Sequence, residues 1–335
     1  MGETMLAARF TGAGEVRLER VPIPLPGPDE VLVRVHSCAL CGSDRMGWGK
    51  GSSVTPGHEI SGTIVSAGGD SGTPMAGTPG VIFLVDGCGS CRSCVTGSPN
   101  RCLRKRAMYG FTAPGGLAEY VVVRSSCFLP VDAGIPLDAA TALLDLFGTS
   151  AHAFRVAGRL QMRSVLVIGC GPIGLGAIAV ARALGVPEIV ATDVARARLK
   201  LAGEVGATPV AASAPDGLRG GLAPDGFDVV IEAAGLPSTQ RQAIELTAAG
   251  GVAVLIAHSE SPVEVRASVD LIAREITVMG SEYFRPDEFP DNHERLRTGV
   301  LDPKPVITHT FRLEDLAEAC DLFFSGGGGK VLVQP

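Results

Sequence analysis

The sequence has no run of more than three basic residues and no uninterrupted apolar segment long enough to cross a membrane. Its 29 Lys and Arg residues stand against 35 Asp and Glu residues, so the net charge is −6, spread along 335 residues. One short basic cluster, 101–106, contains four cations beside cysteines, which favours a solvated loop. A chain without a basic patch cannot release counterions from nucleic acid, so nucleic acid is not an expected partner.

The longest uncharged stretch is 165–181, and glycines and a proline interrupt it. It is short for a helix that crosses a bilayer, and a buried strand followed by a buried helix explains it better. Residues 1–10 lack the charged head and apolar stretch of a signal peptide. We therefore expect a cytoplasmic protein with no membrane partner, in a reducing compartment where clustered cysteines more often bind metal than form disulfides.

The distribution of apolar residues predicts two domains. With 46% apolar and 19% charged residues, the chain has a globular composition and enough length for two cores. The first part contains short alternating apolar runs broken by Gly and Pro, which predicts a β-rich domain. From Ser164 strands alternate with helices, which predicts an α/β fold with a doubly wound parallel sheet. The expected strands are 31–35, 60–65, 81–85, 120–123, 164–168, 188–192, 228–232, 252–256, 276–279 and 330–333, and the expected helices are 172–184 and 195–205.

We expect residues 1–147, completed by 283–335, to form the first domain and residues 148–282 to form the second. The active site is expected in the cleft between them, because the motifs described next fall in both parts of the chain.

Four cysteines form a C-x2-C-x2-C-x7-C pattern in a loop rich in Gly and Ser: Cys88, Cys91, Cys94 and Cys102. Thiolates at this spacing can close tetrahedrally on one zinc ion without regular secondary structure. An iron–sulfur cluster is the alternative, but the spacing departs from the ferredoxin patterns. Because four thiolates leave no coordination position for water or substrate, we expect this zinc to be structural.

A glycine-rich motif follows the apolar strand 164–168 and precedes a helix; it comprises Gly169, Gly171, Pro172, Ile173 and Gly174. In such a motif the first glycine makes a tight turn, and the second lets the backbone approach a pyrophosphate. The third permits close packing of helix and strand, and the helix N-terminus stabilises the phosphates. The motif therefore predicts a dinucleotide-binding site in a Rossmann domain.

Asp193 ends the next expected strand, nineteen positions after Gly174. A carboxylate there can accept hydrogen bonds from the adenosine ribose and repels a 2′-phosphate, which favours NAD over NADP. Its alternative role is a helix N-cap, and both roles can coexist. NADP remains the alternative cofactor, because Arg196 or Arg198 could pair with its 2′-phosphate.

Two further motifs precede the cysteine-rich loop, Cys41-Gly42-Ser43-Asp44 and Gly57-His58-Glu59-Ile60-Ser61-Gly62. With the loop and the glycine motif after them, this order resembles the zinc-dependent alcohol and polyol dehydrogenases of the medium-chain dehydrogenase/reductase family. The resemblance covers essentially the whole chain, including the tail 329–335. It implies a GroES-like irregular β domain, a Rossmann domain, and a homodimer or homotetramer.

By this resemblance Cys41 and His58 are ligands of a catalytic zinc, and Glu59 is a ligand or a carboxylate that replaces water during turnover. The third protein ligand in the family precedes the nicotinamide-binding helix, and within residues 143–152 only Asp145 fits. An unpaired buried carboxylate is energetically unfavourable, so an acidic residue between two leucines is expected to have a partner, such as a bound metal. Helix N-capping is the alternative reason. His152 is expected to be a packed histidine.

The resemblance also implies roles for residues that hold no metal. Ser43 would carry the alcohol proton toward the nicotinamide ribose, and Asp44 would support a metal ligand. Thr149 would lie against the nicotinamide, and Lys330 would approach the pyrophosphate. Many relatives carry a histidine at the position of Met46, so here the proton relay must end earlier or use water.

The expected activity is hydride transfer between a secondary alcohol or polyol and NAD, with two zinc ions per chain. A zinc ion with an open position acts as a Lewis acid on the substrate oxygen, and hydride then passes to the nicotinamide. Without a histidine at position 46, we expect vicinal polyols, amino-polyols or aminocyclitols to be preferred substrates. The alternatives are an aldehyde or ketone reductase acting on simple alcohols, and a non-catalytic NAD-binding zinc scaffold.

Overall fold

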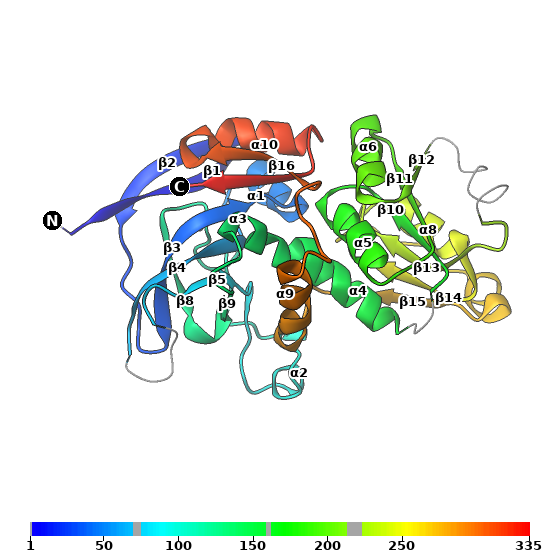
Figure 1. Cartoon of the computed structure of the whole chain (residues 1–335), viewed down its shortest axis with the longest axis horizontal. Coiled ribbons are helices and arrows are strands. Elements are labelled where there is room, and N and C mark those ends of the chain that lie inside the picture. Colours follow the sequence, from blue (N-terminus) through cyan, green and yellow to red (C-terminus); the bar gives the residue numbers. More distant parts are fainter. Residues whose placement is uncertain (1, 70–74, 159–161, 213–222) are drawn as a thin grey trace. The chain divides into compact units, whose positions relative to one another are not determined.

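The computed structural model describes residues 2–69, 75–158, 162–212 and 223–335, which form two compact units. The first unit comprises residues 1–144, 285–297 and 307–335, and the second comprises 145–284 and 298–306. The division expected from the sequence differs most at 298–306, which cluster with the second unit although the chain on either side belongs to the first. Figure 1 shows the elements of both units.

The second unit is built on a six-stranded parallel sheet in the order β12-β11-β10-β13-β14-β15. The chain moves outward from β10 in one direction and from β13 in the other, so the switch point of the sheet lies between these two strands. This order confirms the doubly wound α/β fold. The strands are β10 (Ser164–Ile168), β11 (Glu188–Asp193), β12 (Thr208–Ala211), β13 (Phe227–Glu232), β14 (Thr247–Leu255) and β15 (Thr277–Gly280).

Helices cover this sheet. The helices α5 and α6 contact each other, and α8 contacts β13 and β14. Because crossovers between parallel strands are right-handed, chains that move apart from a switch point place their helices on opposite faces of the sheet. The helical segments are η5 (Asp145–Thr149), α4 (Ser150–Ala157), α5 (Pro172–Ala183), α6 (Arg196–Val205), α8 (Pro237–Leu246), η7 (Ala267–Leu271) and η8 (Ile272–Arg274).

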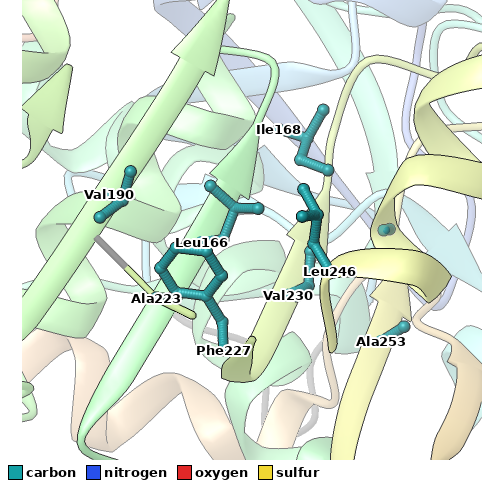
Figure 2. Close-up of a cluster of buried hydrophobic side chains, with 9 residues drawn as sticks. Leu166, Ile168, Val190, Ala223, Phe227, Val230, Leu246 and Ala253 are labelled. Carbon is teal, nitrogen blue, oxygen red and sulfur yellow. The ribbon is translucent and has the colours of Figure 1, made fainter. Parts of the chain in front are cut away.

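A row of apolar side chains crosses the central strands of this sheet (Figure 2). Val190, Leu166, Val230 and Ala253 are register partners on four neighbouring strands, so their side chains share one face. The ring of Phe227 packs in the same cluster and is fully buried. Burying each large apolar side chain contributes about 1.5–3 kcal/mol, and this row therefore holds the four strands in one register. The edge strand β12 is mostly exposed and adds only the partly buried Val210 to this cluster, which explains why the apolar pattern did not predict it.

The first unit contains a seven-stranded sheet with the path β16-β17-β3-β4-β5-β9, in which β8 also pairs with β3. The C-terminal strand β17 pairs antiparallel with β3, and this pairing places the end of the chain in the first unit. The strands of this unit are β1 (Thr4–Gly12), β2 (Glu15–Pro22), β3 (Glu30–Ala39), β4 (Glu59–Ala67), β5 (Pro79–Ile82), β6 (Val85–Asp86), β7 (Ala107–Met108), β8 (Tyr120–Arg124), β9 (Phe128–Pro130), β16 (Ile307–Arg312) and β17 (Lys330–Gln334).

Short helices connect these strands. The strand expected at 81–85 is divided into β5, which pairs with β4 and β9, and β6, which pairs with β7. In the parts of the chain that the structure describes, no helix is long and apolar enough to cross a membrane. The helical segments are η1 (Gly42–Asp44), α1 (Arg45–Lys50), α2 (Arg92–Val95), η2 (Pro99–Arg101), η3 (Ser125–Cys127), α3 (Leu137–Ala140), η4 (Thr141–Leu143), η9 (Pro286–Glu288), α9 (Phe289–Arg297), η10 (Leu313–Asp315) and α10 (Leu316–Phe324).

Candidate active site and metal centre

Four buried side chains that can ligate a metal lie together: Cys41, His58, Glu59 and Asp145. One ligand atom from each lies within 4.8 Å of the others. Antiparallel pairing of β3 with β4 sets Ala39 opposite Glu59, so the residues just after β3 and just before β4 become neighbours. Asp145 is bonded directly to residue 144, where the first segment of the first unit ends.

The charges of this group favour a bound cation. With Cys41 as a thiolate and Glu59 and Asp145 as carboxylates, the group would carry three negative charges in a buried space, against one positive charge from Lys330 at Glu59. Like charges buried together are strongly unfavourable unless a counter-ion balances them. A divalent cation would offset this negative charge. Sulfur, imidazole nitrogen and carboxylate oxygen are the ligand atoms that zinc takes in proteins, so the residues fit zinc.

The orientation of His58 is set by Asp44, which lies in η1. His58 Nδ1 lies 3.2 Å from Asp44 Oδ1, and the N–H of Cys41 donates to Asp44 Oδ2 over 2.9 Å. A carboxylate beside one ring nitrogen fixes the tautomer and leaves the other nitrogen available for a metal. The second ring nitrogen, Nε2, lies 3.4 Å from the hydroxyl oxygen of the exposed Ser43. The ring of Phe111 packs on the His58 ring at 4.7 Å between centroids.

Glu59 and Lys330 form a buried ion pair. Their side chains are 0% and 1% exposed, and the Lys330 ammonium donates to Glu59 Oε1. The family resemblance implied that Lys330 would approach the cofactor pyrophosphate. The structure instead places its ammonium on Glu59, because a carboxylate buried this deeply needs a counter-charge. Register explains the proximity, since β17 pairs with β3 and β3 pairs with β4.

Asp145 opens the π-helix η5, which leads directly into α4. Its Oδ1 accepts a hydrogen bond from the Thr149 hydroxyl over 3.5 Å. Asp145 is therefore the first residue of a helical segment, and the N-cap of α4 is Thr149, so Asp145 does not cap that helix. Thr149 is buried, and His152 in α4 is buried outside the four-residue group. Helices with a π-bulge often occur at functional sites, because the bulge turns side chains that a regular helix would place elsewhere.

The four cysteines of the loop also lie together, with Sγ atoms all within 4.8 Å of one another: Cys88, Cys91, Cys94 and Cys102. Three of the sulfur–sulfur distances are 3.5, 3.7 and 4.0 Å. Four zinc–sulfur bonds of about 2.3 Å at tetrahedral angles would separate the sulfurs by roughly 3.8 Å. None of the four is in a disulfide. The loop is therefore shaped for a tetrahedral zinc with no open position.

Main-chain N–H groups prepare two of these thiols for metal binding. The N–H groups of Ser90 and Cys91 lower the pKa of Cys88 to about 5, and the Cys91 N–H lies 3.3 Å from its sulfur. The N–H of Cys88 in turn lowers the pKa of Cys102, from 3.4 Å. Desolvation raises the pKa of Cys94 to about 12. The thiolate is the form that binds metal, so Cys88 and Cys102 carry it most readily.

The glycine-rich motif lies between the end of β10 and the start of α5, and a different structural constraint favours glycine at each of its three glycine positions. Gly169 has a φ of +93°, in the region that favours glycine. A Cβ on Gly174 would lie 1.8 Å from the carbonyl oxygen of Gly169, so no side chain fits there. A Cβ on Gly171 would meet nothing within 4 Å, which leaves this backbone open to a ligand. Pro172 is the first residue of α5, and Ile173 follows it.

Asp193 ends β11 beside this motif. Its Oδ2 accepts the N–H of Cys170 over 2.7 Å, and its Oδ1 accepts the N–H of Ala195 over 2.8 Å. Ala195 is the N-cap of α6, so Asp193 supports the start of that helix without being its cap. The two hydrogen bonds hold a buried carboxylate next to the glycine motif, where its negative charge acts on any group bound there.

Sequence reasoning missed two contacts of the metal site. The packing of Phe111 on His58 and the pairing of Lys330 with Glu59 join residues that are far apart in the chain. A local pattern carries no signal for either contact. An isolated lysine at the start of an apolar C-terminal strand was the one available hint, since lysine is rarely buried without a partner.

Family models match both units. Residues 27–133 match the alcohol dehydrogenase GroES-like domain, and residues 172–298 match the zinc-binding dehydrogenase domain. Two solved structures extend the likeness to the whole chain. An alcohol dehydrogenase from E. coli CFT073 in complex with NADH has a TM-score of 0.91 at 27% identity, with 100% of each chain covered. A zinc-binding dehydrogenase from Sinorhizobium meliloti 1021 bound to NADP has a TM-score of 0.90 at 31% identity, covering 99% of this chain and 100% of that one.

Several curated relatives of similar length are named L-threonine 3-dehydrogenase. L-threonine 3-dehydrogenase of Bacillus licheniformis is 33% identical over 330 residues, covering 95% of this chain and 94% of its own. The enzyme of that name from Streptomyces coelicolor is 35% identical over 332 residues, covering 94% of this chain and 95% of its own. Both likenesses span the two units and both metal-binding clusters described above. The chain therefore belongs to the zinc-dependent medium-chain dehydrogenases and is an oxidoreductase.

Proposed function

We propose that this dehydrogenase transfers hydride between NAD and a secondary alcohol whose neighbouring carbon carries a hydroxyl or amino group. The observation that carries the proposal is the buried set Cys41, His58, Glu59 and Asp145, with the hydroxyl of Ser43 at 3.4 Å from His58 Nε2. We also propose two zinc ions per chain, one in this set and one in the four-cysteine loop.

When bound, zinc held by Cys41, His58 and Asp145 supplies a Lewis acid to the substrate oxygen, and NAD accepts the hydride. The protein's own contribution is to orient these groups and to move one proton. Asp44 holds the His58 ring in place, as its carboxylate lies 3.2 Å from Nδ1. The exposed Ser43 hydroxyl would take the alcohol proton and pass it to solvent.

Position 46 contributes no second proton carrier. Met46 is 59% exposed and offers only a thioether, which neither binds nor releases a proton at neutral pH. A substrate with an adjacent hydroxyl or amine would itself supply the hydrogen-bonding group that Met46 does not provide. A site that relies on such a group discriminates strongly against substrates without it.

The names of similar proteins support this substrate class. The relatives named L-threonine 3-dehydrogenase act, by name, on a hydroxyl beside an amino-bearing carbon. Solved structures of 2R,3R-butanediol dehydrogenase, at 26% identity, and galactitol-1-phosphate dehydrogenase, at 28% identity, concern substrates with neighbouring hydroxyls. These names share a vicinal polar group and differ in the rest of the substrate.

NAD is proposed as the cofactor because of Asp193. The N–H groups of Cys170 and Ala195 donate hydrogen bonds to this buried carboxylate and so fix its orientation. A fixed negative charge at the end of the second strand repels the 2′-phosphate of NADP. Similar structures contain NADH in one case and NADP in another, so the choice must come from residues of this chain.

The test is a screen of the purified zinc-loaded protein, by NADH absorbance at fixed NAD. L-threonine, inositol-like compounds, amino-sugar-like compounds and open-chain polyols are compared with 2-butanol and benzyl alcohol. We expect the vicinal substrates to exceed simple alcohols in kcat/KM by about tenfold or more. Ser43→Ala should lower kcat, whereas Ser53→Ala, which alters another exposed serine, should not. Faster turnover of simple alcohols would show that the pocket is apolar and that this substrate class is wrong.

A further inference from the structure

Glu232 ends β13 as a fully buried carboxyl group. Its Oε1 accepts three hydrogen bonds, from the N–H of Ala234 at 2.9 Å, the N–H of Gly235 at 2.8 Å and the hydroxyl of Thr239 at 2.7 Å. Thr239 lies in the first turn of α8. One oxygen atom therefore ties together the strand end, the following turn and the helix start. Oε2 is buried and has no hydrogen-bond partner among the described residues.

The turn that Glu232 holds, residues 233–236, packs against the first glycine of the dinucleotide motif. The N–H of Ala233 donates to the carbonyl of Ile168, at the end of β10, over 2.8 Å. A Cβ on Gly169 would lie 2.9 Å from the nitrogen of Ala234. β10 and β13 are the neighbours at the switch point, where doubly wound sheets bind their ligands. A shift of the turn would therefore move the surface on which Gly169 rests.

We propose that Glu232 is a positioning residue for the dinucleotide: it holds turn 233–236 so that the Gly169 backbone keeps its cofactor-binding conformation. This inference rests on the proposed NAD-dependent function, and it assigns to Glu232 an effect on the affinity of the dinucleotide site. All three hydrogen-bond donors to Glu232 belong to the turn and to α8, so its removal should act on cofactor binding and spare the zinc-binding clusters.

A glutamine is the conservative replacement at this position. Burial raises the pKa of the Glu232 carboxyl above its usual value, against the effect of the three hydrogen bonds. A neutral side chain of the same shape keeps an oxygen in the place of Oε1 and so keeps the three donors satisfied. Alanine removes the acceptor, so the N–H groups of Ala234 and Gly235 lose their partner and the turn loses its connection to the end of β13.

Asp228 provides a matched control on the same strand. Its Oδ2 accepts the N–H groups of Arg163 and Ser164 over 2.7 and 3.1 Å. It is thus also a carboxylate that ties down two main-chain N–H groups, but it lies near the amino end of β13, at the opposite end of the strand from Glu232. Asp228→Ala should lower the melting temperature without touching the Gly169 loop.

The experiment measures the Kd of NADH and of NADPH by fluorescence titration of the zinc-loaded protein, with melting temperature and zinc content for each variant. We expect Glu232→Ala to raise the Kd of the preferred cofactor by about tenfold or more, since small misplacements of a binding backbone have large effects. Glu232→Gln and Asp228→Ala should stay within about threefold of the unmodified protein. The KM for NAD should follow the Kd, while kcat at saturating NAD and the zinc content stay unchanged.

The outcomes for the positioning role of Glu232 and for the proposed function can be distinguished. Equal Kd values for Glu232→Ala and the unmodified protein, or equal losses in Glu232→Ala and Asp228→Ala, would overturn the positioning role and leave the proposed function standing. An unmodified protein that binds neither NADH nor NADPH would overturn both. Should Glu232→Ala fail to fold, Thr239→Val removes only one of the three donors, and an unchanged Kd in that variant would overturn the proposal.

Discussion

Replacing Lys330 with methionine should destabilise the first unit far more than replacing an exposed lysine. Lys330 and Glu59 are 1% and 0% exposed, and the ammonium of one donates to the carboxylate of the other. Removing one partner of a buried ion pair leaves an uncompensated charge, at a cost of about 3–5 kcal/mol. In a unit of this size each kcal/mol lowers the melting temperature by about 2–4 °C. The expected loss for Lys330→Met is therefore about 6–20 °C.

Lys200→Met is the matched control. The Lys200 side chain is 80% exposed, and its ammonium lies 3.6 Å from Glu204 one helical turn away. Exposed pairs of this spacing contribute about 0.3–0.5 kcal/mol, which corresponds to about 2 °C at most. The two substitutions remove the same charge from the same type of residue. Lys200 lies in the second unit, so each melting shift is compared with the melting of the unit that contains the substitution, and burial is the main difference between the two sites.

Calorimetric melting of both variants, with bound zinc and after chelation, is the assay. A bound divalent cation would supply part of the charge that Lys330 supplied, so the loss should be larger after chelation. The double variant Lys330→Met with Glu59→Leu removes both charges and should recover most of the stability, because a matched apolar pair avoids the desolvation cost. If Lys330→Met melted no lower than Lys200→Met, or the double variant recovered nothing, the buried-pair argument would be wrong.

Three further outcomes are expected. Elemental analysis should find two zinc ions per chain, and a single zinc in the native protein would refute the catalytic site. Cys41→Ser should lose the more labile zinc ion and the activity while the protein stays folded, whereas Cys91→Ser should lower the stability of the protein. Asp193→Ala should narrow the preference for NAD over NADP in kcat/KM, and equal use of both by the unmodified protein would contradict the role of its charge. Hydrogen bonds from Arg241 and then Arg266 hold the pKa of Asp270 well below its usual range. The stability that Asp270 contributes is therefore fully present above the unfolded-state pKa, declines below it, and is lost as pH falls through the folded-state pKa. Asp270→Asn should therefore melt lower at pH 7, with a smaller difference near pH 3.

The two metal-binding clusters differ in how far the sequence could define them. The cysteine loop is local: its four thiols lie close in the chain, and their spacing alone allows tetrahedral closure. The set of Cys41, His58, Glu59 and Asp145 was assembled from a resemblance, because its members come from separate segments. The structure brings their ligand atoms within 4.8 Å, through strand pairing and the π-helix that opens at Asp145.

Local periodicity determined the doubly wound fold, because buried parallel strands and their crossover helices leave a pattern in the order of apolar residues. Short exposed strands such as β12 leave no such pattern. Tertiary structure alone decided which charges meet. Lys330 and Glu59 are 271 positions apart, and their pairing follows from the register of three strands. The turn after Glu232 meets Gly169 because β10 and β13 are neighbours at the switch point. Such contacts depend on which strands lie side by side, and no spacing within one segment records that.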